Sequence, residues 1–462
     1  MEVTVMKPRI LVLTTEPLPL PGLPATGAGL RAWGLGFGLR SAGFEDVVLG
    51  FAADSARGVD LDLDQIPGIR MFERSQLDDF IASVKPDAVV FQHWGLWSEL
   101  KRPLPCPVAM DLAGPHLLER RLWGSADPAG DLRQKLTALA AVDHTVCSGE
   151  FQRHYFIPFL VQAGHDPRSH LCPVIPFSLS PDLPEASLQR ERDTLLFGGM
   201  FLPWQDPEAT LRTVVETLEE KRKGKLVFIG GPHPAGDVSG GRFDTLMEFL
   251  EKSDRVEIHR TMSFDKYLET LCRCGLAIDL MPRNAERELA FPTRTVGYLW
   301  AGLPVIHNNY DELAEPISRA RAGWAMDAND RDGLKKLLVR ILGHKEDIER
   351  RAEKARELVT ENYTWDRTIG PLAGWCENPK PRAEKRAPIV AVAADTAPAE
   401  PRKKRRREGK VQYAPPTPMA DTASRGAWYL APIVFTVALP ISICLLLLFA
   451  AAELVRLVLR RK

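Results

Sequence analysis

The stretch "ERELAFPTRTVGYLWAGLPVIHNNYDELAEPI", Glu286–Ile317, places charged residues directly beside a buried strand. Its segment "TRTVGYLWA" predicts a helix, and "LPVI" predicts a strand after a turn at Gly302 and Pro304. Thr293 and Arg294 then fall at the amino end of the helix, where backbone amides and a guanidinium can hold a diphosphate together. The alternative is that Arg294 is a surface residue paired with a nearby glutamate.

Around this stretch, short apolar runs alternate with helix-like segments over most of the chain. This alternation predicts parallel, doubly wound α/β sheets. The series restarts near residue 190, which predicts two facing Rossmann-like domains, residues 1–185 and 186–375, with a ligand between them. The last helix of the second domain is expected to return to the first. The runs interpreted as strands are "RILVLTT", "DVVLGF", "DAVVFQHW", "CPVAMDLAG", "DHTVCS", "LCPVIPF", "DTLLFGGM", "KLVFIGG", "RVEIHR", "GLAIDLM" and "LPVIHNN".

The end of the chain differs from the rest in composition. From residue 376 onward, sixteen Lys and Arg stand against seven Asp and Glu, although the whole chain has a formal net charge of zero. The remainder is therefore acidic and a poor candidate for binding nucleic acid. Residues 376–425 are rich in Pro, Ala and charge and predict a disordered linker. Their basic run Arg402–Arg407 is solvated linker charge, a patch for anionic lipids, or a nuclear-import-like decoy.

A long apolar segment follows this linker. Residues 426–452 carry no charged side chain and are long enough to cross a bilayer as a helix, with Trp428 and Tyr429 as interfacial anchors. They predict a transmembrane anchor over 426–456 and a basic tail over 457–462. Prolines within the segment also fit a kinked or shallowly inserted helix. Because no secretory signal is visible, we expect a membrane-anchored protein whose globular domains face the cytoplasm.

Two further groups of residues are candidates for binding a ligand. Glu286 and Glu288 lie just before the helix discussed first, where a ribose or hexose would present hydroxyls. In "TGAGLR", Gly27 and Gly29 permit a tight turn and close approach of a ligand to backbone amides, which predicts an acceptor or phosphate loop with Arg31. The alternative for this loop is a sterically tight turn from strand to helix.

Catalytic candidates follow a predicted strand in "VAMDLAGPHLLERR". Asp111, His116 and Glu119 are carboxylates and an imidazole, which suit proton transfer near neutral pH. A structural role is the alternative for His116. His93 in "FQHWGLWSE" competes with it, unless its ring merely packs against the neighbouring tryptophans.

Metal and disulfide chemistry are not indicated by the sequence. The seven cysteines are scattered, and the ten histidines lie apart without the spacing of a ligand set. We therefore expect reduced thiols and no metal site.

The motifs also resemble a known family. "FPTRTVGYLWAGLPVI" resembles the donor-binding segment of GT-B glycosyltransferases of the large retaining family that includes many polysaccharide mannosyl- and glucosyltransferases. "LLFGGMFLPWQDPEATLRTVVETL", "FIGGPHP" and "TGAGLRAWGLGFGLRSAGFEDVVLGF" are similar to other parts of that fold, so the resemblance covers residues 8–375. It implies a retaining hexosyltransferase that uses a nucleotide-diphosphate sugar as co-substrate, a glycan or lipid-linked acceptor, no cofactor and no divalent metal.

This resemblance implies further donor-binding residues and shows two departures. The implied residues are Gly199, Trp204, Asp206 and His233. Where members have a carboxylate for the ribose, this chain has Gly297, and the family's paired Arg and Lys are missing near Gln205. Arg294 is then expected to take the phosphate role and Glu286 or Glu288 the sugar role. These departures also fit a membrane-tethered, non-catalytic scaffold or nucleotide-sugar-binding protein, and a nucleotide-sugar epimerase is a third alternative.

Overall fold

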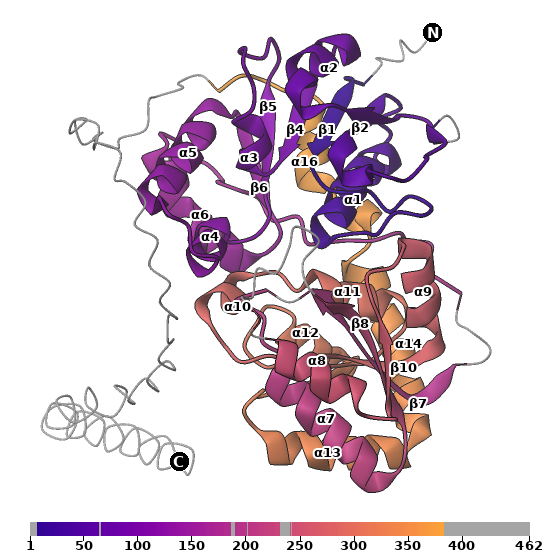
Figure 1. Ribbon diagram of the computed structural model, residues 1–462. Helices are drawn as coiled ribbons and strands as arrows, with labels where there is room; N and C mark the ends of the chain where they lie inside the picture. Colours follow the sequence, from indigo (N-terminus) through magenta and orange to yellow (C-terminus); the bar gives the residue numbers. More distant parts are fainter. Residues whose placement is uncertain are drawn as a thin grey trace, which may run out of the picture. The chain divides into compact units, whose positions relative to one another are not determined.

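Two parallel sheets of six strands each form the framework of this computed structural model, which describes residues 7–63, 66–185, 190–200, 202–231, 241 and 243–382 (Figure 1). The strands of the first sheet, in spatial order, are β3 (Ile69–Phe72), β2 (Val47–Ala52), β1 (Ile10–Thr14), β4 (Ala88–Gln92), β5 (Val108–Leu112) and β6 (His144–Cys147). Those of the second are β12 (Gly323–Met326), β11 (Val305–Asn308), β10 (Cys274–Asp279), β7 (Glu191–Met200), β8 (Lys225–Gly231) and β9 (Val256–His259).

Both sheets are wound in the same way. In each, the first strand lies in the middle, the next two extend to one side and the last three to the other. The order reverses between β1 and β4 in the first sheet and between β7 and β10 in the second. Ligands of such sheets bind beyond the carboxyl ends of the strands at this reversal. The two predicted Rossmann-like halves are therefore confirmed.

Helices cover both faces of each sheet, since separate apolar clusters lie on either side. The first half contains α1 (Gly27–Ser41), α2 (Leu77–Val84), α3 (Trp94–Trp97), α4 (His116–Leu122), α5 (Pro128–Ala141), α6 (Glu150–Gln162) and the 3-10 turns η1 (Ala53–Ala56) and η3 (Arg74–Gln76). The second contains α7 (Glu208–Lys221), α8 (Asp244–Glu251), α9 (Phe264–Arg273), α10 (Ala285–Leu289), α11 (Thr293–Trp300), α12 (Ala314–Ala320), α13 (Arg331–Gly343) and α14 (Lys345–Asn362).

The chain then returns to the first half through α15 (Trp365–Thr368) and α16 (Gly370–Cys376), drawn in orange beside the indigo and purple strands in Figure 1. Ile369 and Leu372 belong to the apolar cluster that α1 and β1 also line. Gly38 of α1 permits this packing, because a Cβ there would lie 2.9 Å from Ile369.

The strand predicted at "LCPVIPF" does not form. This segment contributes only one isolated bridge, between Val174 and Cys147, because Pro173 and Pro176 lack the N–H groups that a strand donates. Conversely, β3 and β12 were not among the predicted strands.

None of the described helices combines the length and the apolar character that crossing a bilayer requires. The predicted transmembrane anchor at 426–456 and tail at 457–462 lie outside the described residues, as does the predicted linker beyond residue 382. These three segments stay predictions.

Arg31 and Asp111 form a buried ion pair that joins α1 to β5. Arg31 Nη2 lies 2.9 Å from Asp111 Oδ1, and Nε donates to Oδ2 at 3.0 Å. Arg31 also donates to the carbonyl oxygens of Ile175 and Pro176. The sequence placed Asp111 among catalytic groups and Arg31 in a phosphate loop. In the structure, both carboxylate oxygens of Asp111 instead accept hydrogen bonds from Arg31, and Asp111 is 0% exposed.

We expect Asp111→Ala to lower the free energy of unfolding by about 3–5 kcal/mol, because it leaves the Arg31 charge buried without its partner. Urea unfolding of the detergent-solubilised full chain measures this loss. Asp166→Ala, which breaks the exposed pair with Arg168, is the control and should leave the unfolding midpoint unchanged. Equal midpoints for the two variants would rule out the structural role.

Candidate functional site

A cavity of about 740 Å³ opens where the carboxyl ends of both sheets meet. Thr15 and Glu16 border it directly after β1, and Gly198 and Gly199 border it at the end of β7. The residues thus come from the winding reversal of each sheet, the position at which this architecture binds ligands.

Arg294, in the first turn of α11, lines the cavity as the sequence predicts. Its Nη2 donates to Gln205 Oε1, and its Nη1 lies 3.7 Å from Asp279 Oδ1. The guanidinium lies flat against Gly199, where a Cβ would come within 2.6 Å of Nη1. Gly199 therefore serves to place this cation, and the side chain remains 18% exposed toward the cavity.

The amino ends of α1 and α11 meet across the cavity. A Cβ at Gly27 would lie 2.8 Å from Thr293 Oγ1, so the missing side chain lets the two helices approach. Neither helix has an acidic residue in its first turn. Because each helix dipole is positive at this end, the two helices and Arg294 favour an anion in the cavity.

Gly29 has a different role from Gly27. A Cβ there would overlap the carbonyl oxygen of Pro17, and its backbone N donates to Thr26 Oγ1 at 3.0 Å, which caps α1. Gly29 therefore maintains the tight turn that was the alternative explanation for this loop.

A buried polar network below α11 was not found from the sequence. Thr295 Oγ1 donates to Asp279 Oδ2 at 2.7 Å and lies 3.2 Å from His307 Nδ1, while His307 Nε2 lies 2.8 Å from Asp311 Oδ1. Burial lowers the pKa of His307, but Asp311 outweighs it and raises that pKa above its usual value. Burial also raises the pKa of Asp279, but Arg294 and His307 bring that pKa below its usual value. Asp279 is therefore an ionised anchor for Arg294.

The sequence held one signal for this network. Asp279 closes the strand in "GLAIDLM" and His307 lies near the end of the strand in "LPVIHNN", and the two are paired across neighbouring parallel strands. Polar residues at the ends of adjacent parallel strands meet at the same edge of a sheet.

A second group of polar residues lies where α4 of the first half contacts α10 of the second. His116 Nδ1 is 2.7 Å from Glu119 Oε2, and the His93 ring packs edge-on against His116 at 3.8 Å between centroids. Burial raises the pKa of Glu119, but His116 and Arg287 bring it below its usual value. Glu119 therefore stays ionised and orients the His116 imidazole through Nδ1.

His93 carries backbone strain beside this pair. Its φ of 75° lies in a region that favours glycine, and its Nδ1 accepts from Gly95 N at 3.0 Å. Burial and the nearby His116 hold its pKa well below the usual value, so it is neutral. Both histidines considered in the sequence therefore lie together.

Glu286 faces this group rather than the cavity. It is 2% exposed and accepts from Arg287 Nε at 3.0 Å. Burial raises its pKa to about 7, against the pull of Arg287. Glu288 lies nearer the surface and pairs with Arg283.

In the loop after β7, the residue between the predicted Trp204 and Asp206 is the one that reaches the cavity. Gln205 lines the cavity, whereas Trp204 is buried with its ring 5.9 Å from that of Trp123. Asp206 Oδ1 accepts from Glu208 N at 3.1 Å at the start of α7. His233 lies outside the described residues.

In the described part of the chain, no cluster of His, Cys, Asp and Glu could hold a metal ion.

No protein-family model matches this sequence, and the comparison with curated proteins found no match. Solved structures do match. Sucrose-phosphate synthase of Thermosynechococcus elongatus aligns with a TM-score of 0.59 at 14% identity, over 80% of this chain and 98% of that chain. HepE of Anabaena, in complex with UDP and glucose, aligns with a TM-score of 0.55 at 11% identity, over 80% and 100%.

An alpha-glucosyltransferase in complex with UDP and a 13-mer DNA aligns with a TM-score of 0.56 at 11% identity, over 80% of this chain and 100% of that chain. These solved structures are glycosyltransferases of the GT-B type, as the motifs of this sequence led us to expect. The likeness shows that this chain has the GT-B fold.

Stability should depend on pH through Glu286. Its raised pKa means that the folded state keeps a proton that the unfolded state loses above its usual pKa of 4.5. The free energy of unfolding should therefore fall as pH rises from about 4.5 to about 7, by on the order of 3 kcal/mol at most. Glu286→Gln should remove this fall, whereas Glu288→Gln should retain it. Urea unfolding across this range measures both variants, and identical pH profiles would contradict the assignment.

Proposed function

We propose that the protein transfers a hexose from a nucleoside-diphosphate sugar to the hydroxyl of an acceptor. The observation that carries this proposal is the Arg294 guanidinium at the amino end of α11, on the wall of the cavity between the halves. Structures of the same fold in complex with UDP, namely those of HepE and the alpha-glucosyltransferase, support a nucleotide as ligand.

Charge stabilisation is the main chemical task of this cavity. As the bond from the sugar C1 to the diphosphate breaks, negative charge grows on the departing oxygen, and a new bond forms from C1 to the acceptor oxygen. The Arg294 guanidinium is placed before the reaction by Asp279 and Gly199. Preorganised donors of this kind stabilise a growing charge without reorganising.

His116 and Glu119 are proposed to act on the transferred sugar or on the acceptor. With Nδ1 held by Glu119, the other nitrogen of His116 can accept the hydroxyl proton or bind a hydroxyl of the sugar. Proton transfer to His116 goes with inversion at C1. In a retaining reaction, the departing phosphate would take the hydroxyl proton, and His116 would bind a hydroxyl of the transferred sugar.

The acceptor is proposed to be a membrane-proximal glycan or lipid-linked sugar, because the sequence predicts an anchor at 426–456. The globular halves would then work at the cytoplasmic face of the membrane. We propose no cofactor and no metal in the reaction, since Arg294 and the helix ends supply the positive charge.

A non-catalytic, nucleotide-sugar-binding scaffold is the second candidate, and Gly297 favours it. Gly297 lines the cavity, and a Cβ there would meet no atom of the described residues within 4 Å. Where the family places a carboxylate for the ribose, this part of the described chain therefore leaves open space.

Arg294→Ala should weaken binding of a nucleoside-diphosphate sugar by about tenfold to a hundredfold, because a charge-assisted contact to phosphate is lost. Calorimetric titration of the full chain with UDP-, GDP- and ADP-sugars measures this loss. Arg331→Ala removes an exposed arginine of the same half and is the matched control. Binding that survives Arg294→Ala would overturn the donor site, and no heat with any sugar nucleotide would overturn the proposed function.

His116→Ala should lower kcat by about a hundredfold, since a positioned acid or base contributes this much. His154→Ala removes an exposed histidine of the same half and should leave kcat unchanged. The anomer of the product, read by NMR, then assigns the role of His116: inversion indicates proton acceptance, and retention indicates contact with the sugar. An unchanged kcat in His116→Ala would exclude both roles.

A further inference from the structure

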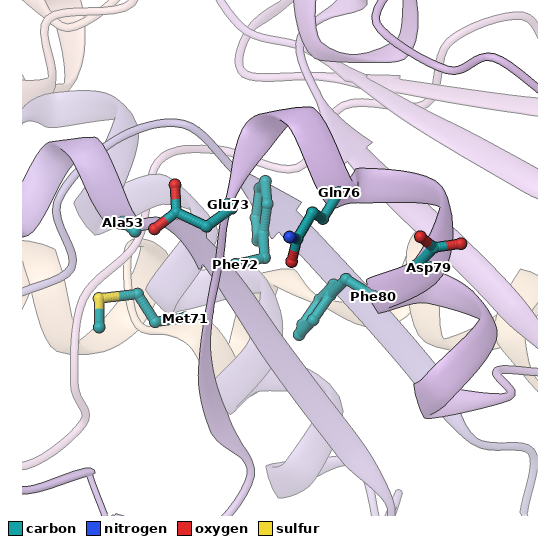
Figure 2. A pocket seen from close by; sticks show the side chains of 7 residues that line it. All are labelled: Ala53, Met71, Phe72, Glu73, Gln76, Asp79 and Phe80. Carbon is teal, nitrogen blue, oxygen red and sulfur yellow. The ribbon is translucent and has the colours of Figure 1, made fainter.

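A separate pocket of about 390 Å³ lies at the edge of the first sheet, between β3, η3 and α2 (Figure 2). Its aromatic and apolar surface comes from Phe72, Phe80 and Met71, and its polar rim from Glu73 and Gln76. In Figure 2 the side chains of Phe72, Gln76 and Phe80 lie around the pocket, with Glu73 on the side of Ala53. Pockets of this size fall within the range that holds small organic ligands.

The floor of this pocket is built into the fold. The rings of Phe72 and Phe80 lie 5.2 Å apart, and Phe72 is buried. Gly50 of β2 makes room for the second ring, because a Cβ there would lie 2.8 Å from Phe80. Met71 adds an apolar surface that is 41% exposed.

The polar groups of the rim suit a ligand rich in hydroxyls. The side chains of Glu73 and Gln76 make no hydrogen bond or ion pair with any residue in the described part of the chain. Asp79, the third polar residue, is held by Arg102 Nη2 at 2.6 Å. A carboxylate and an amide accept hydrogen bonds from hydroxyls, and the amide also donates.

The charge of the pocket argues against an anionic ligand. The residues lining it include two carboxylates and no Lys, Arg or His. A phosphate-bearing ligand such as nucleic acid would meet repulsion here, whereas a neutral polyol would not.

The pocket adjoins the cavity between the two halves along the chain. Ala53 lines the pocket, and the next residue, Asp54, lines the cavity. Likewise, Glu73 lines the pocket, and the next residue, Arg74, lines the cavity. Arg74 lies 3.7 Å from Asp54 and pairs with Glu99, so the wall between the two spaces is held by ion pairs.

We infer that this pocket binds a neutral sugar residue of the acceptor, while a more distant part of the same glycan reaches the cavity. Phe72, Phe80 and Met71 would contact the apolar face of the sugar ring, and Glu73 and Gln76 would bind its hydroxyls. The assignment as an acceptor site rests on the proposed glycosyl transfer, whereas the binding of a neutral glycan does not.

Saturation-transfer NMR and calorimetry of the full chain in detergent test this inference with maltotetraose, α-mannotetraose and chitotetraose as probes. We expect at least one tetrasaccharide to bind, and Glu73→Ala with Gln76→Ala to weaken its binding about tenfold or more. Glu353→Ala, an exposed glutamate of α14, is the matched control. Thermal unfolding of the double variant checks that its fold is retained.

Three results would overturn the inference: no tetrasaccharide binds, its binding survives the double variant, or a 13-mer single-stranded DNA binds in a manner that the double variant abolishes. Titration with a nucleotide sugar alongside separates this inference from the proposed function. Nucleotide-sugar binding without tetrasaccharide binding refutes only the pocket. Tetrasaccharide binding that depends on Glu73, without nucleotide-sugar binding, refutes the transfer and leaves a glycan-binding pocket.

Discussion

The ion pair between Arg294 and the buried carboxylate of Asp279 is the interaction on which the site depends. Asp279, 2% exposed and ionised, lies 3.7 Å from Arg294 Nη1, while Gln205 accepts a hydrogen bond from Nη2, so both hold the guanidinium at the amino end of α11. Thr295 donates to Asp279 and contacts His307 in turn, and Asp311 raises the pKa of the buried His307. A cation is therefore fixed before any ligand arrives, and such preorganisation makes an electrostatic contact effective.

The two halves supply different groups to the proposed site. The second half supplies the anion-binding groups around α11, whereas the first supplies the His116–Glu119 pair and the separate pocket at β3. The contact of α4 with α10 brings His116 and Glu119 close to Glu286, so this contact buries titratable groups. Burial in this contact is what raises the pKa of Glu286.

Local sequence patterns predicted most strands and helices, but they did not predict which side chains pair with one another. Apolar runs identified most strands, and the helix starting at Thr293 placed Arg294 correctly because a helix end is a local signal. Asp279 and His307 escaped notice because Thr295 of α11, which contacts both, is distant from each of them in the sequence. In the loop after β7, the prediction missed by one residue, since Gln205 reaches the cavity and its neighbours Trp204 and Asp206 do not.

A structure of the full chain with a nucleoside diphosphate bound tests the central claim most directly. The account predicts phosphate oxygens within hydrogen-bonding distance of the Arg294 guanidinium, at the amino end of α11. A diphosphate bound elsewhere, with Arg294 still occupied only by Gln205 and Asp279, would contradict it.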